Sequence, residues 1–213
     1  MQLKNRKSAL LLIDIQKGLK EEAYYGGNRN NPGAEANARR ILDQWRKLNL
    51  PLFHVQHSSQ NSESPLHASK PGFALQEIVQ PRPGEPVLVK NVNSAFIGTN
   101  LKEQLDQLEI KTLVIVGLTT NHCVSTTVRM AGNYGYETIL VADATATFDR
   151  TGINGERYDA ETIHQISLAS LNDEFATVVD TEELLDTIAY EVSKEESAFD
   201  FEETVDDILK ERK

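Results

Sequence analysis

The chain has 213 residues, of which 39% are hydrophobic and 25% charged, a composition typical of a globular protein rather than a disordered or fibrous one. No apolar run approaches the roughly 20 residues that cross a bilayer. The apolar run at residues 8–13 is too short for a signal peptide and lacks a small-residue cleavage site. The single cysteine excludes an internal disulfide and a metal site built from several cysteines. We therefore expect a cytoplasmic protein without membrane contact.

The net charge of −10 is concentrated at the C-terminus. Residues 182–213 contain twelve acidic and four basic side chains, which accounts for eight of the ten net negative charges. The remaining chain is close to neutral, which argues against a nucleic-acid partner. Apolar positions in the tail predict helices that we expect to dock in a homo-oligomer. We assign one domain to residues 1–190 and an acidic helical extension to residues 191–213.

Six short apolar segments without strict alternation are typical of buried parallel strands. Segments with apolar residues at helical spacing lie between them. Strands that alternate with helices predict an α/β fold in which a mostly parallel sheet is covered on both faces. The predicted strands are residues 9–15, 51–57, 86–90, 112–117, 138–142 and 176–179, and the predicted helices are residues 34–48, 101–108, 124–134 and 158–171.

Three reactive side chains follow predicted strands. Asp14 lies at the end of the first strand, Lys90 at the end of another, and Cys123 shortly after a third. Because ligand sites in such sheets lie beyond the carboxyl ends of the strands, we expect these residues at one edge. The long segment 58–86 is rich in Ser, Pro, Gly and His and could cover this edge.

Cys123 stands between a predicted strand and a predicted helix. At a helix N-terminus, the helix dipole and free N–H groups stabilise a thiolate and bind a developing oxyanion. We expect Lys90 to lower the pKa of the thiol further and Asp14 to carry its proton. Each residue has a plainer alternative when taken alone, since an isolated cysteine is commonly a small buried hydrophobe. Asp14 could cap a helix, and Lys90 could be a surface lysine.

Three blocks of sequence carry a resemblance to a known family. Residues 11–16 read LLIDIQ, residues 89–99 read VKNVNSAFIGT, and residues 117–124 read GLTTNHCV. In this order they resemble the signature blocks of the isochorismatase-like cysteine hydrolases. Further matches are Gly135-Tyr136, residues 143–146 and His164.

The resemblance implies a Rossmann-like, three-layer α/β/α fold with a six-stranded, mostly parallel sheet. It also implies a triad in which Asp14 accepts a proton, Lys90 fixes and polarises, and Cys123 attacks a substrate carbonyl to form an acyl enzyme. A cis peptide bond is implied between Leu118 and Thr119. The backbone N–H groups of Thr119 and Cys123 would form the oxyanion hole.

The sequence departs from the pattern of nicotinamidases, which are metal-dependent members of this family. Those enzymes carry an Asp-x-His pair after the second strand, whereas residues 54–60 read HVQHSSQ here and contain no acidic residue. Although His54, His57 and His67 could still gather as ligands, we expect neither a metal nor another cofactor. His54 is interpreted as a strand residue, and the other two as lining or capping the pocket loop.

The retained cysteine favours cleavage of a C–N bond in a small amide, ureido or lactam substrate. Family members that cleave the vinyl ether of isochorismate often lack the nucleophilic cysteine, so isochorismate hydrolysis is the alternative. A third possibility is a binding or redox protein that uses the thiol without catalysis. We further predict five substrate-binding residues, while His164 is interpreted as structural. The five are Gln16, Asn93, Phe96, His122 and Phe148.

Overall fold

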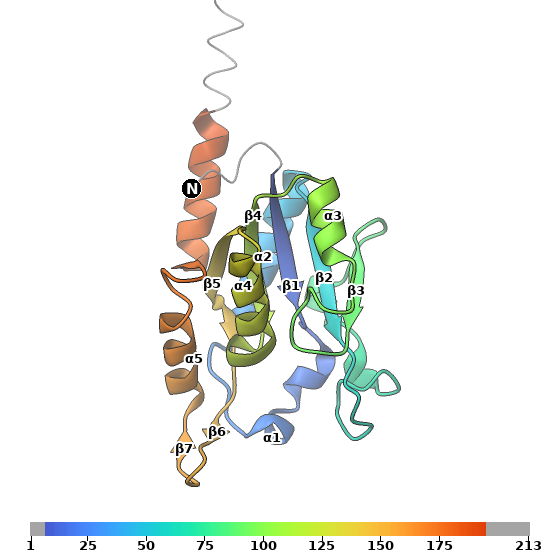
Figure 1. The fold of residues 1–213 in the computed structure, drawn as a ribbon, viewed down its shortest axis with the longest axis vertical. Coiled ribbons are helices and arrows are strands. Elements are labelled where there is room, and N and C mark those ends of the chain that lie inside the picture. Colours follow the sequence, from blue (N-terminus) through green and yellow to red (C-terminus); the bar gives the residue numbers. More distant parts are fainter. Residues whose placement is uncertain (1–6, 195–213) are drawn as a thin grey trace, which may run out of the picture.

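The computed structural model describes residues 7–194, and the predicted extension beyond residue 194 lies outside the described residues. Its centre is a six-stranded sheet in which every neighbouring pair is parallel, in the order β3-β2-β1-β4-β5-β8 (Figure 1). The three-layer fold and the six predicted strands are confirmed. The strands are β1 (Ser8–Ile13), β2 (Leu52–His57), β3 (Val87–Lys90), β4 (Thr112–Leu118), β5 (Glu137–Ala146) and β8 (Thr177–Val179).

Alternate residues of β1 face opposite layers of the core. Leu11 and Ile13 pack in a cluster with α3 (Leu101–Gln107), α4 (Ser125–Asn133) and α5 (Ala160–Ala169). Leu10 and Leu12 pack in a second cluster with α2 (Ala34–Lys47) and with residues 181–194, which are helical. A strand that is apolar on both faces must be covered on both, and Figure 1 shows helices in front of and behind the sheet.

The predicted helix ends agree with the structure within about three residues, but two local features differ. The predicted helix 124–134 is preceded by a π-helical turn over Thr120–Val124, so the regular α-helix begins at Ser125. The strand predicted at 138–142 continues to Ala146 as β5. The helix of residues 181–194 also runs across the domain boundary that we placed at residue 190.

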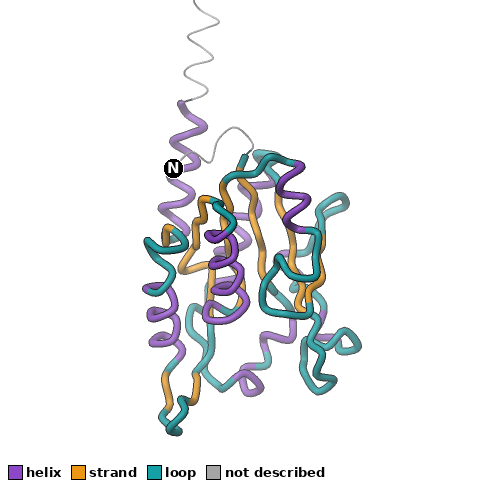
Figure 2. The backbone as a smooth tube through the Cα atoms, in the orientation of Figure 1, coloured by secondary structure: helices purple, strands orange, loops and turns teal. Residues whose placement is uncertain are grey.

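Loops and short elements surround the carboxyl ends of the strands, as Figure 2 shows. They include 3-10 helices at Lys17–Lys20, Pro71–Phe73 and Glu77–Val79, the short helix α1 (Glu22–Tyr25), and a hairpin of β6 (Arg150–Thr151) and β7 (Arg157–Tyr158). The sequence did not predict α1 or the hairpin. Among the described residues, no helix is long and apolar enough to cross a membrane.

Candidate active site

Asp14 and Lys90 form an ion pair beneath the carboxyl edge of the sheet. The Lys90 Nζ lies 2.6 Å from Asp14 Oδ2, and each residue is only 1% exposed. Asp14 follows β1 directly and Lys90 ends β3, so the fold brings together two side chains that are 76 residues apart. The second carboxylate oxygen of Asp14 is buried and has no hydrogen-bond partner among the described residues. It is therefore available to accept a proton from a neighbour.

His57 ends the strand that lies between the strands of this pair. It is the register partner of Lys90, and its Nδ1 lies 3.2 Å from the Lys90 Nζ. Burial, and next the charge of Lys90, lower the pKa of His57. A neutral imidazole can accept a hydrogen bond from the ammonium group through Nδ1. Three neighbouring strand ends thus deliver a carboxylate, an imidazole and an ammonium group to one place.

Cys123, which follows β4, lies close to Asp14 and His57. It lies in the π-helical turn between that strand and α4 and is half-buried. Its Sγ, a carboxylate oxygen of Asp14 and a ring nitrogen of His57 all lie within 4.8 Å of one another. The peptide bond between Leu118 and Thr119, at the start of this turn, is cis as the resemblance implied. Gly117 before it has a φ of +124°, and a Cβ there would collide with the Ile13 carbonyl oxygen of β1.

The electrostatics of the thiol differ from the expectation. Burial, and next the negative charge of Asp14, raise the pKa of Cys123 above the usual thiol range, and Lys90 offsets this only in part. The prediction of a lowered pKa is therefore wrong for the substrate-free protein. The pKa is raised because Asp14 already neutralises Lys90 and because a thiolate in a buried site loses its hydration. Cys123 rests as a thiol and needs a base.

A cavity of about 170 Å³ opens on the thiol. The segment 58–86 contributes to its wall, in keeping with the role expected for that segment, and so do the elements that follow β1 and β5. Apolar and hydroxyl side chains surround the reactive groups, so the cavity suits a small organic molecule. Its lining residues are Asp14, Leu19, Tyr25, His57, Ser59, Ser64, Leu66, Asn93, Leu118, Thr119, His122, Cys123 and Arg150.

Two of the five predicted substrate-binding residues line this cavity. The Oδ1 of Asn93 lies 3.9 Å from Cys123 Sγ. His122 stands next to the nucleophile in the sequence, and its Nδ1 lies 2.9 Å from Arg150 Nη2. Asn93 and His122 therefore lie in the wall of the cavity that opens on the thiol.

The other three lie outside the cavity wall. Gln16 is fully buried, and its amide holds the backbone of His57 and the carbonyl of Phe73. Phe96 packs in the core against aromatic neighbours. Phe148 is also fully buried and supports the wall from behind, with its ring 5.2 Å from that of Tyr25.

Several residues of the cavity wall were not predicted as substrate-binding, among them His57, Arg150 and Tyr25. His57 was interpreted as lining or capping the pocket loop, and its place at a strand end carries the same signal as that of Lys90. Arg150 begins a two-residue strand, which carries no periodicity, so no sequence signal pointed to it. Tyr25 lies twelve residues after Ile13, the end of β1, and nothing in its sequence context points to the site.

The sequence of this chain matches the family model described as "Isochorismatase domain" over residues 8–183. The chain belongs to the isochorismatase family. It is 49% identical over 179 residues to the isochorismatase family protein YrdC of Bacillus subtilis, which covers 84% of this chain and 95% of that protein.

Other family members show similarity at the level of structure and of sequence. The crystal structure of a putative isochorismatase-family hydrolase from Chromobacterium violaceum superposes with a TM-score of 0.84 at 38% identity, covering 89% of this chain and 97% of that one. Nicotinamidase 3 of Arabidopsis thaliana is 29% identical over 190 residues, which cover 83% of this chain and 86% of that protein.

The metal cluster of the family's nicotinamidases does not fit the residues present here. His57 and Asp14 both contact the ammonium group of Lys90, so a divalent cation between them would meet a positive charge. His54 is buried against Glu85, and His67 contacts Ser69 in an exposed segment. The three histidines are therefore not gathered in one site.

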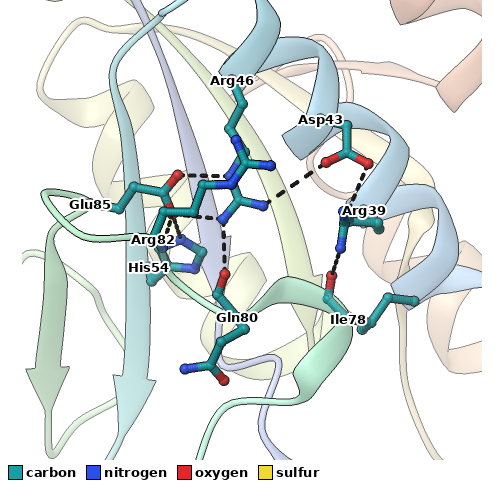
Figure 3. Close-up of polar contacts among 8 residues, drawn as sticks. All are labelled: Arg39, Asp43, Arg46, His54, Ile78, Gln80, Arg82 and Glu85. Carbon is teal, nitrogen blue, oxygen red and sulfur yellow. Dashed lines mark hydrogen bonds and ion pairs between the residues drawn. The ribbon is translucent and has the colours of Figure 1, made fainter.

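A larger cavity, of about 450 Å³, lies at the opposite edge of the sheet, where β2 and β3 begin. Its main charged groups are already paired. The Arg46 guanidinium binds both carboxylate oxygens of Glu85, and His54 Nε2 lies 3.0 Å from the same carboxylate (Figure 3). These hydrogen bonds help hold the pKa of Glu85 at about 2. The polar groups that are poised to react lie at the carboxyl edge.

Proposed function

We propose that this chain is a cysteine hydrolase that cleaves the C–N bond of a small amide, ureido or lactam substrate through an acyl enzyme. The observation that carries the proposal is the constellation around Cys123. The Cys123 thiol and Asp14, one carboxylate oxygen of which has no partner among the described residues, line one small cavity, and the other Asp14 oxygen pairs with the buried Lys90. Membership of a hydrolase family that includes a nicotinamidase, an amide-cleaving enzyme by its name, supports the same bond class.

The first half-reaction transfers the acyl group to sulfur. The carboxylate of Asp14 takes the thiol proton as Sγ bonds to the carbonyl carbon, and the carbonyl oxygen becomes an oxyanion. The backbone N–H groups of Thr119 and Cys123 are the proposed donors to this oxyanion. The C–N bond then breaks, and the proton on Asp14 passes to the leaving nitrogen. This leaves a thioester on Cys123 and a neutral amine.

The second half-reaction hydrolyses the thioester. Water adds to the acyl carbon and gives a proton to Asp14, and the C–S bond then breaks to release the acid. The departing sulfur recovers the proton from Asp14, which restores the resting thiol. Because the pKa of the thiol is raised, the sulfur does not rest as a thiolate between turnovers, and proton transfer is coupled to attack. Lys90 holds the Asp14 carboxylate through both halves, and His57 and Asn93 position Lys90 and the thiol.

The test is a hydrolysis panel of nicotinamide, ureido acids, carbamoyl amines, lactams and isochorismate. We expect turnover of a C–N substrate, and a fall in kcat of about a thousandfold or more in C123A, because no other residue can form the thioester. The positive control is N133A, a substitution at the end of α4 away from the cavity. An unchanged kcat in C123A would contradict the covalent mechanism.

The alternative activities give different results in the same panel. Isochorismate hydrolysis would release pyruvate and persist in C123A, because cleavage of a vinyl ether needs an acid rather than a covalent step. A non-catalytic thiol protein would turn over none of the compounds and would form no acyl adduct on Cys123.

A further inference from the structure

Arg150 places a positive charge in the wall of the catalytic cavity. It begins β6 in the hairpin that follows β5, and it lines the same cavity as Cys123 and Asn93. Its side chain is partly buried, and its Nε is buried without a hydrogen-bond partner among the described residues. Burial lowers its pKa, yet a guanidinium group stays protonated at any physiological pH. The charge is therefore present and incompletely solvated.

None of the described carboxylates forms an ion pair with Arg150. The acid beside it in the sequence, Asp149, is occupied by Arg157 from the partner strand, with Nη2 and Oδ2 2.6 Å apart. The backbone N–H of Ala160 and the amide of Asn28 bind the same carboxylate. The two arginines of the hairpin thus differ in whether a carboxylate pairs with them. Arg157 is neutralised by the protein, and Arg150 faces the cavity.

His122 orients Arg150 without neutralising it. The Nη2 of Arg150 lies 2.9 Å from His122 Nδ1. Burial, and next the charge of Arg150, lower the pKa of His122, so the ring is neutral at pH 7 and can accept a hydrogen bond. A neutral acceptor fixes the direction of the guanidinium group and leaves its charge available to a ligand.

From these contacts we propose that Arg150 binds a carboxylate of the substrate, which makes the preferred substrates amido or ureido acids rather than neutral amides. The inference rests on the proposed function for the bond that is cleaved. The planar fork of a guanidinium group matches a carboxylate in two parallel hydrogen bonds, and such charge-assisted bonds strengthen as water is excluded. Since the cavity is only about 170 Å³, the carboxylate and the scissile carbonyl lie within one small molecule.

The test compares two alkylating probes of nearly equal size on Cys123. Iodoacetate and iodoacetamide both form an S–C bond with release of iodide, but only iodoacetate carries a negative charge. Because Cys123 is the only cysteine, intact mass reports the cavity alone. We measure the ratio of the iodoacetate rate to the iodoacetamide rate and divide it by the same ratio for glutathione.

We expect this normalised ratio to fall about tenfold in R150Q, which is the effect of losing one charge-assisted contact. R150K, which keeps the charge but loses the fork, should retain part of the preference. R157Q removes the same charge from the same hairpin outside the cavity, so its ratio should equal that of the wild type. An equal fall in R150Q and R157Q, or no fall in R150Q, would overturn the inference.

A second measurement does not depend on whether R150Q folds. In the wild-type protein, acetate should slow the alkylation of Cys123 by iodoacetamide more than sodium chloride does at equal ionic strength, and equal slowing would count against the inference. Neither measurement needs turnover. A charge preference without amide hydrolysis would overturn the proposed function alone, and hydrolysis without a charge preference would overturn the role of Arg150 alone.

Discussion

The two edges of the sheet hold buried charges in opposite states. At the amino edge, both oxygens of Glu85 accept hydrogen bonds from Arg46 (Figure 3), and His54 Nε2 lies 3.0 Å from the same carboxylate. At the carboxyl edge, one oxygen of Asp14 and the Nε of Arg150 lack partners beside the only thiol. Buried charges whose hydrogen bonds are all formed within the protein stabilise the fold, whereas a buried polar group without a partner can bind a ligand or accept a proton.

The largest difference between the edges should be in catalysis. D14N removes the base and should lower kcat by about a thousandfold, while E85Q makes the same change of carboxylate to amide at the other edge and should leave kcat near the wild-type value. Steady-state kinetics on a C–N substrate, with both variants verified as folded by circular dichroism, checks this. A comparable loss of kcat in E85Q would contradict the assignment of the catalytic base to the carboxyl edge.

Breaking the buried Asp14–Lys90 pair should lower the free energy of unfolding. K90M leaves the carboxylate of Asp14 buried and unpaired, so the free energy of unfolding should fall by about 3–5 kcal/mol. The double variant D14N/K90M carries no unpaired charge and should recover about 2 kcal/mol of that loss. Urea unfolding measures both. A double variant that is no more stable than K90M would show that the charge of Asp14 is not what destabilises it.

A smaller effect concerns the pH dependence of stability at the amino edge. Burial lowers the pKa of His54 in the folded state, so below the unfolded pKa of about 6.5 the unfolded chain binds the proton more readily. The stability that neutral His54 contributes above this pH is therefore lost as the pH falls. The wild type should lose up to about 1.4 kcal/mol per pH unit more than H54Q below pH 6.5. If the free energy of unfolding changes with pH to the same extent in both proteins between pH 7.5 and 5, the prediction is wrong.

The sequence predicts the sheet and its reactive edge because both rest on local signals. Apolar runs locate the strands, and the positions of Asp14, Lys90 and Cys123 after strands place them together. The direction in which a loop side chain points follows from tertiary packing. Gln16 and Phe148, both predicted to bind substrate, are therefore buried outside the cavity wall. Two-residue strands carry no periodicity, so the hairpin that presents Arg150 gave no signal.

The pKa of Cys123 depends on the same tertiary information. Proximity of Lys90 alone predicts a lowered value, but the sign of the shift is set by burial and by the neutralisation of Lys90 through Asp14. The consequence is a nucleophile that is deprotonated during attack rather than before it.

The most direct test of this account is the intact mass of the protein during turnover of a C–N substrate. Rapid acid quenching of the wild type should reveal an added mass equal to the acyl group, lost on longer incubation and absent from C123A. Turnover at an undiminished rate in C123A, with no acyl mass on the wild type at any time, would contradict the account.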